Sequence, residues 1–121
     1  MRTVTFAALL ALAGPVIAAG PPQFQVRHTA DYVALCTTSP GEEHYTSAIA
    51  FCHGFGVGAY HYYNATTAQA DRFVCPPNPA PKRSEVIDAF VTWAKTRPDM
   101  MQKPAVDAVF VYLSGRWPCK K

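Results

Sequence analysis

The amino-acid sequence predicts an all-α fold, a small four-helix domain with two disulfide bonds. Apolar residues recur at helical spacing in four segments, and no segment alternates apolar and polar residues as a half-buried strand does. Four cysteines occur in a chain of only 121 residues. This length predicts one domain, and a domain of this size buries too little surface to dispense easily with covalent cross-links.

Residues 1–19 are expected to be a secretory signal peptide. Arg2 precedes an apolar run, Gly14-Pro15 breaks it, and small residues allow cleavage after Ala18 or Ala19. The run is too short for a transmembrane helix, and charged residues or proline interrupt every later apolar stretch. We therefore expect an exported, periplasmic protein without a membrane span, whose helical domain comprises residues 20–121.

The charge of the chain excludes one class of partner. The formal net charge is +3, and it falls by one when Arg2 is removed with the signal peptide. Because so small an excess is spread along the chain, the sequence argues against nucleic-acid binding.

The longest predicted helix covers Ser47–Tyr63, with an approach from Glu42. Its two faces differ in the size of their side chains. The bulkier face consists of Tyr45, Ala48, Ile49, Cys52, Phe55, Gly56, Ala59 and Tyr63. The opposite face consists of the smaller set Ser47, Ala50, Gly54, Val57 and Gly58. We expect Gly54 and Gly58 to let a second helix pack closely, from the same chain or from a homodimer partner. Glu42 and Glu43 are expected in the first turn, where the helix dipole favours negative charge.

Three shorter helices are predicted around this one. The first is His28–Cys36, with Thr29 as a possible N-cap residue. Another covers Arg83–Thr96, and the last begins at Pro104 and stops at Gly115. Their expected apolar stripes are Val86, Phe90, Trp93 and Ala94 in the third helix, and Val106, Val109, Phe110 and Leu113 in the fourth. Phe73–Cys75 is expected to be a short buried tether, and Pro76–Pro81 a stiff surface connection.

Four cysteines allow three pairings. Export and an even count favour two disulfides over buried free thiols. A short link makes the third and fourth helices antiparallel neighbours, which brings Cys75 near Cys119 and leaves Cys36 to pair with Cys52. The main alternative pairs Cys36 with Cys75 and Cys52 with Cys119.

The sequence contains no pattern typical of an enzyme. The candidate residues for catalysis or metal binding are His28, His44, His53 and His61. They form no i, i+4 pair on a helix, and no Cys-x-x-Cys motif is present. Adjacent helical residues project about 100° apart, so Cys52 and His53 are poorly placed as a nucleophile and base. We expect no catalytic, metal-binding or cofactor-binding residues.

A candidate binding surface lies at the end of the long helix. His61 and Tyr62 are expected to project outward, and exposed tyrosine is a frequent anchor of protein interfaces. Together with Asn64 and Arg72 they form a candidate partner surface. The alternative is a helix end that neighbouring loops cover.

Several short motifs follow one another along the chain. They are Tyr32-Val-Ala-Leu-Cys36, Ala50-Phe-Cys-His-Gly54 with Gly58, Phe73-Val-Cys-Pro76, Arg97-Pro98, Lys103-Pro-Ala105 and Trp117-Pro-Cys119. Together they resemble the Rap1a/Tai family of immunity proteins, and they occur in that family's order over about residues 31–119. The chain departs from the family pattern at Lys82, at Lys103 and in the proline-rich run Pro76–Pro81.

The resemblance implies a function. Family members are small exported helical proteins with disulfides, and characterised ones neutralise peptidoglycan-cleaving amidases of the type VI secretion system, often as homodimers. We therefore expect a periplasmic immunity-type protein that inhibits a cell-wall amidase by occluding its active site. The alternative from another class is a small periplasmic helical chaperone or stress protein.

Overall fold

The computed structural model describes residues 24–121 and confirms the all-α prediction. In this part of the chain the helices are α1 (Thr29–Cys36), α2 (Tyr45–Thr66), α3 (Arg83–Lys95) and α4 (Ala105–Arg116), with short 3-10 turns η2 (Gln69–Asp71) and η3 (Pro98–Met100). The expected signal peptide, residues 1–19, lies outside the described residues. None of the helices in residues 24–121 has the length and apolar character needed to span a bilayer.

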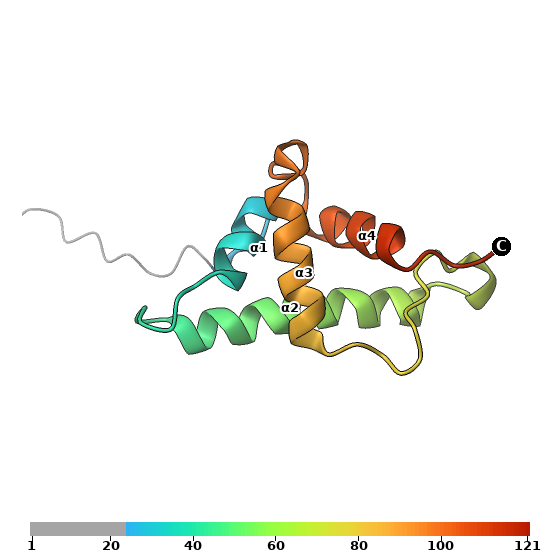
Figure 1. The fold of residues 1–121 in the computed structure, drawn as a ribbon, viewed down its shortest axis with the longest axis horizontal. Coiled ribbons are helices and arrows are strands. Elements are labelled where there is room, and N and C mark those ends of the chain that lie inside the picture. Colours follow the sequence, from blue (N-terminus) through green and yellow to red (C-terminus); the bar gives the residue numbers. More distant parts are fainter. Residues whose placement is uncertain (1–23) are drawn as a thin grey trace, which may run out of the picture.

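Helix α2 is the base on which the other elements pack. It lies along the long axis of the molecule, α3 crosses it, and α1 and α4 lie on either side of α3 (Figure 1). The short helix α1 contacts all three of the others. Every helix therefore contributes to one core, whose least exposed side chains include Tyr32, Leu35, Cys52, Ala94 and Ala108.

The start of α1 is anchored to the segment before α4, and the prediction of Thr29 as its N-cap is wrong. His28 occupies the N-cap position, and Thr29 is completely buried. The Thr29 hydroxyl donates a hydrogen bond to the Lys103 carbonyl oxygen at 3.1 Å, and the Thr29 N–H donates to the same oxygen at 2.9 Å. Thr29 is therefore the first helical residue, and its hydroxyl and N–H join α1 to the segment before α4.

Helix α2 begins later than its charge pattern suggests. His44 is the N-cap residue, so Glu42 and Glu43 precede the first turn rather than lie in it. A Glu42 carboxylate oxygen instead accepts a hydrogen bond from the Ser39 N–H at 2.7 Å and closes the preceding turn. At its other end α2 continues to Thr66, three residues beyond the predicted Tyr63.

Helix α4 buries Val109 and Leu113 of the predicted stripe, but its buried face is shifted toward the alanines. Its buried residues are Ala105, Ala108, Val109, Tyr112 and Leu113. Val106, which was expected in the core, is 43% exposed. Two small alanines allow close helix packing, and the bulkier Val106 is left at the edge.

The ends of α4 also differ from the prediction. Pro104 is the N-cap residue, not the first helical residue, and the helix continues through Gly115 to Arg116. Gly115 does not adopt a positive φ, so it is not a left-handed C-terminal cap. The helix ends where Trp117 precedes Pro118, since a residue before proline disfavours the helical conformation.

The segment after α2 is held by the Tyr63 hydroxyl. Its oxygen accepts hydrogen bonds from the N–H groups of Phe73, at 2.8 Å, and Val74, at 3.1 Å. Val74 is buried, but Phe73 is 48% exposed, so the prediction of a buried Phe73 is wrong. In extended chain neighbouring side chains point to opposite sides, and here the valine points inward.

A Tyr63→Phe variant is expected to lose about 2 kcal/mol of unfolding free energy, because two backbone N–H groups would lose their acceptor. Tyr60→Phe is the matched control, since the Tyr60 hydroxyl forms no hydrogen bond within residues 24–121 and Tyr60 is only half-buried. Urea unfolding followed by circular dichroism measures both. Equal losses in the two variants would contradict the role given to the Tyr63 hydroxyl.

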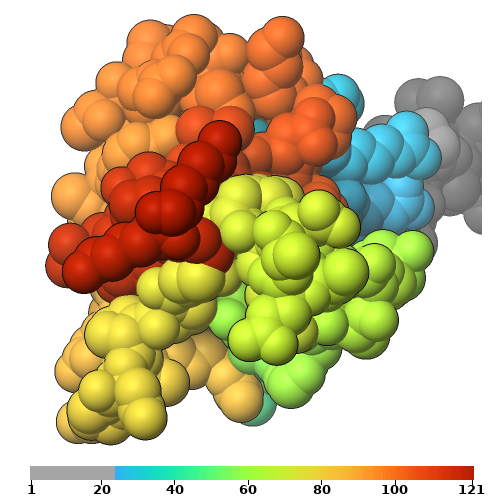
Figure 2. All heavy atoms as spheres, turned by 90° about the vertical axis from the view of Figure 1, so that its right-hand side faces the viewer, coloured from blue at the N-terminus to red at the C-terminus, as the bar shows by residue number. Residues whose placement is uncertain are grey.

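The disulfide pairing derived from helix order is confirmed, and the alternative pairing is wrong. Cys36 at the end of α1 is bonded to Cys52 in α2, and Cys75 is bonded to Cys119. The second bond joins two segments that lie side by side at one end of the molecule, the yellow residues after α2 and the red C-terminal residues (Figure 2). One bond therefore ties α1 to α2, and the other ties the C-terminal segment to the segment after α2.

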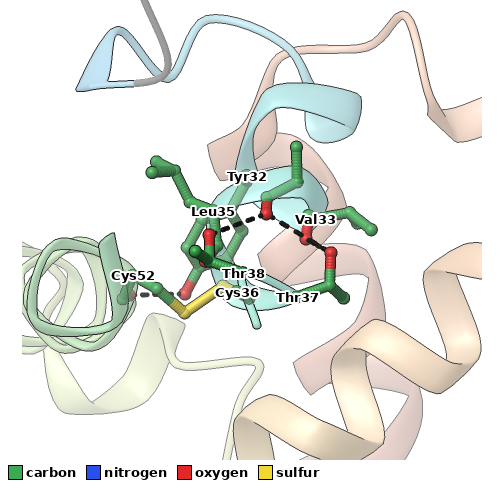
Figure 3. The surroundings of a disulfide bond; sticks show 8 residues. Tyr32, Val33, Leu35, Cys36, Thr37, Thr38 and Cys52 are labelled. Carbon is green, nitrogen blue, oxygen red and sulfur yellow. Dashed lines mark hydrogen bonds between the residues drawn. A yellow bond between two sulfur atoms is a disulfide. The ribbon is translucent and has the colours of Figure 1, made fainter. Parts of the chain in front are cut away.

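Tyr32 lies next to the Cys36–Cys52 bond (Figure 3). Its hydroxyl donates a hydrogen bond to the Cys52 carbonyl oxygen at 2.9 Å, and the side chain is 1% exposed. Burial disfavours the phenolate and raises the pKa of Tyr32 from 10.0 to about 12.

This shift predicts a loss of stability in alkaline solution. The unfolded chain releases the Tyr32 proton near pH 10.0, whereas the folded chain keeps it until about pH 12. Stabilisation that is complete below pH 10.0 is therefore lost as the pH rises through this window, by up to roughly 2–3 kcal/mol. Urea unfolding at about pH 9 and about pH 11 should show a smaller loss in Tyr32→Phe than in the wild type. Equal losses of unfolding free energy in the two proteins would contradict the assignment of the alkaline destabilisation to Tyr32.

Candidate functional site

An exposed apolar surface lies between α2 and α4. It forms an open hollow whose lining includes Gly54, Gly58, Tyr62, Val106 and Phe110. Phe73 borders this surface, with its ring centroid 6.0 Å from that of Phe110. We call these six residues the α2–α4 patch.

The patch places Gly54 and Gly58 at the surface. A Cβ atom at either glycine would meet no atom within 4 Å. Within residues 24–121, therefore, no second helix packs on them, and the expectation of close packing inside one chain is not realised. The physical reason is that α1 and α3 approach α2 from the other side, where a Cβ at Gly56 would lie 2.6 Å from the Tyr32 hydroxyl.

The four residues of the predicted partner surface do not face one common hollow. Tyr62 is 72% exposed and lines the α2–α4 patch. His61, one residue earlier, lines a different hollow beneath the proline-rich segment. Arg72 is half-buried and donates a hydrogen bond from its guanidinium to the Asn64 carbonyl oxygen at 3.3 Å. The last two residues thus tie the loop after α2 back to the end of the helix.

Sequence reasoning missed three members of the patch. Phe73, Val106 and Phe110 were all expected inside the core, because a large apolar side chain at helical or extended spacing is normally buried. The small residues Ala105 and Ala108 are the signal that the packed face of α4 is offset by one residue from the predicted stripe that begins at Val106. The result is an apolar surface assembled from α2, α4 and the segment between α2 and α3.

A second hollow lies beneath the proline-rich segment, between α2, α3 and α4. Its volume is about 430 Å³. Apolar and aromatic side chains make up most of its lining, and the members used below are Val57, His61, Ala80, Arg83 and Val109. We call it the proline-segment hollow. Sequence analysis gave no sign of it, because five separate stretches of the chain form its walls.

The charged groups of the described residues suggest no catalytic arrangement. The side chains of His28 and Asp31 lie 3.6 Å apart and Arg97 forms an ion pair with Asp99, and neither pair includes a residue of the patch. The short Arg97–Asp99 hydrogen bonds lower the pKa of Asp99. Among residues 24–121 no three His, Cys, Asp or Glu side chains are grouped to hold a metal ion, and all four cysteines are oxidised. Cys52, being in a disulfide, is not available as a nucleophile.

These features define a small disulfide-linked helical domain with an exposed apolar surface. Comparison with protein families places it more narrowly. Residues 28–119 match the family model of Rap1a immunity proteins, and the chain belongs to this family. Searches of curated proteins and of solved structures gave no match. Membership of an immunity family implies a protein partner and fits a protein that acts by binding rather than by catalysis.

Proposed function

We propose that the protein is a periplasmic immunity protein that binds a secreted peptidoglycan amidase and occludes its active site. The match to Rap1a immunity proteins over residues 28–119 carries this proposal. The two disulfides support it, since structural disulfides form in oxidising compartments such as the periplasm. Residues 1–19 would serve as the signal peptide, and the amidase would be an effector of a type VI secretion system.

Inhibition by occlusion needs a rigid surface rather than reactive groups. The α2–α4 patch offers apolar anchors on helices that the core and the Cys36–Cys52 bond hold in place. Tyr62 is the strongest candidate anchor. Its large aromatic ring is 72% exposed, so burying it against a partner removes the most apolar area from water and contributes most to binding free energy. Asn64 and Arg72 lie at the edge of the same helix end, and His61 flanks it.

The same patch can also seat a second copy of the chain. Gly54 and Gly58 are one helical turn apart on an exposed part of α2, and the space above both is open. Small residues at this spacing let two helices approach closely. Because Tyr62 lines the same hollow as Gly54 and Gly58, a homodimer formed here and a bound amidase would compete for the patch.

Binding to the product of the adjacent gene tests the proposed function. The purified mature protein should retain that hydrolase in a pull-down and inhibit its release of fragments from peptidoglycan at a one-to-one ratio. Tyr62→Arg should weaken inhibition by at least about tenfold, because a desolvated aromatic anchor is replaced by a charge. Val111→Arg is the control, since Val111 is exposed on α4 outside the patch.

Two results would oppose the proposal. If no secreted hydrolase is encoded nearby and no cell-wall amidase is bound or inhibited, the effector assignment fails while the family assignment stands. If the protein instead prevents aggregation of unfolded client proteins at acid pH, it is a chaperone. Equal inhibition by wild type and Tyr62→Arg would reject the patch as the inhibitory surface.

A further inference from the structure

The proline-segment hollow combines an apolar interior with a single cation, Arg83, at its rim. Its buried members include Tyr32, Ile87, Phe90 and Leu113, which form the floor. Its exposed members include His61 of α2 and Arg83 of α3. No Asp or Glu is among its lining residues, and neither ion pair in residues 24–121 involves Arg83. The guanidinium is thus available to an anion that enters the hollow.

The size of the hollow limits what it can hold. At about 430 Å³ it falls in the lower part of the range of about 300–1,000 Å³ that small-molecule sites occupy. One alkyl chain or ring system fits such a volume, whereas a two-chain lipid does not. The proline-rich segment forms one wall, and its restricted backbone holds that wall in place without a bound ligand.

From these observations we propose that the proline-segment hollow binds a free medium-chain alkyl carboxylate. The chain lies over the aromatic floor, and the carboxylate pairs with the Arg83 guanidinium at the rim. A planar guanidinium matches the two oxygens of a carboxylate, so the headgroup and the cation are complementary in charge and in shape. The site is separate from the α2–α4 patch and does not depend on the proposed inhibition of an amidase.

Three probes with the same chain and different headgroups test the proposal: decanoate, decanol and decyltrimethylammonium. Each is titrated below its micelle concentration into the ¹⁵N-labelled mature protein. Decanoate should bind one-to-one and shift the amide signals of Val57, His61, Ala80 and Val109, which line the hollow. The amide signals of Gly54 and Val106, which line the other hollow, should stay in place. Vesicles of anionic phospholipid should bind no protein.

Two matched pairs of variants separate the headgroup from the chain. Arg83→Gln should weaken decanoate binding about tenfold and leave decanol binding within about twofold. Lys95→Gln, at the exposed far end of the same helix, should change neither. Val57→Trp fills the hollow from a half-buried helix position and should abolish binding of all three probes. Val111→Trp, outside the hollow, should not.

Several outcomes would overturn the proposal. They are absence of decanoate binding, equal affinity for decanoate and the quaternary ammonium, shifts centred on the α2–α4 patch, and binding to vesicles in preference to free decanoate. Circular dichroism of each variant checks its fold. Because every measurement uses the isolated protein, these outcomes are independent of whether an amidase is bound.

Discussion

A Gly56→Ala variant will be less stable than the wild type by about 2 kcal/mol, although alanine is the better helix former. A Cβ atom at this position would lie 2.6 Å from the Tyr32 hydroxyl oxygen. That hydroxyl cannot move away freely, because it is buried and donates a hydrogen bond to the Cys52 carbonyl oxygen. The cost of overpacking and of a weakened hydrogen bond exceeds the gain of about 1 kcal/mol in helix propensity.

Gly54→Ala is the matched control for this prediction. The two glycines lie two residues apart in α2, but a Cβ at Gly54 would meet nothing within 4 Å. This variant should therefore gain about 1 kcal/mol, the full difference in helix propensity. If urea unfolding shows a loss of stability for Gly56→Ala and a gain for Gly54→Ala, the contact with Tyr32 explains why position 56 requires glycine. A loss of similar size at both positions would contradict it.

The double variant Gly56→Ala/Tyr32→Phe completes a thermodynamic cycle. Removing the hydroxyl oxygen opens space for the new Cβ, so the two substitutions should be strongly non-additive, with the double variant more stable than the sum of the single losses predicts. Additive losses would mean that the alanine at position 56 does not clash with Tyr32. This outcome would place the constraint elsewhere in the core.

Removal of the Cys75–Cys119 bond has the largest expected effect. The double variant Cys75→Ala/Cys119→Ala should lose about 4 kcal/mol of unfolding free energy, because the bond closes a loop with a sequence separation of 44 residues. Removal of the Cys36–Cys52 bond, with a separation of 16, should cost about 3 kcal/mol. Domains of this size are stable by only about 5–15 kcal/mol, so loss of both bonds should leave little folded protein.

Thermal and urea unfolding of the two double variants measure these losses. The Cys75–Cys119 variant should also expose the backbone pairing around Val74 and Pro118 to faster hydrogen exchange, because no second cross-link holds these segments together. The core around Tyr32 should remain protected in that variant. Losses below about 1 kcal/mol for both pairs would contradict the role of the bonds as the main staples of the fold.

Sequence reasoning predicted the number and order of the helices because helical periodicity is a local property. It also predicted the disulfide pairing, since a short link between α3 and α4 leaves few ways to arrange their ends. It failed where two neighbouring faces of one helix both looked apolar. In α4 Ala105 and Ala108 are buried and Val106 is exposed, a difference that depends on where the neighbouring helices lie.

The candidate sites were less accessible to sequence reasoning than the fold. Tyr62 was correctly placed at the surface, because it lies on the side of α2 opposite the core. Its neighbours Phe73 and Val106 were not, since their apolar character predicts burial whatever the partner surface requires. The proline-segment hollow requires the relative positions of all four helices and the proline-rich segment, which no local pattern contains.

Hydrogen–deuterium exchange on the complex with the adjacent hydrolase tests the central claim most directly. The claim is that this Rap1a family member acts by covering a partner with the α2–α4 patch. Binding should slow exchange in Gly54–Thr66 of α2 and in the first turn of α4, and leave α3 unchanged. Protection confined to α3 or the proline-rich segment, or no protection at any concentration of the hydrolase, would contradict it.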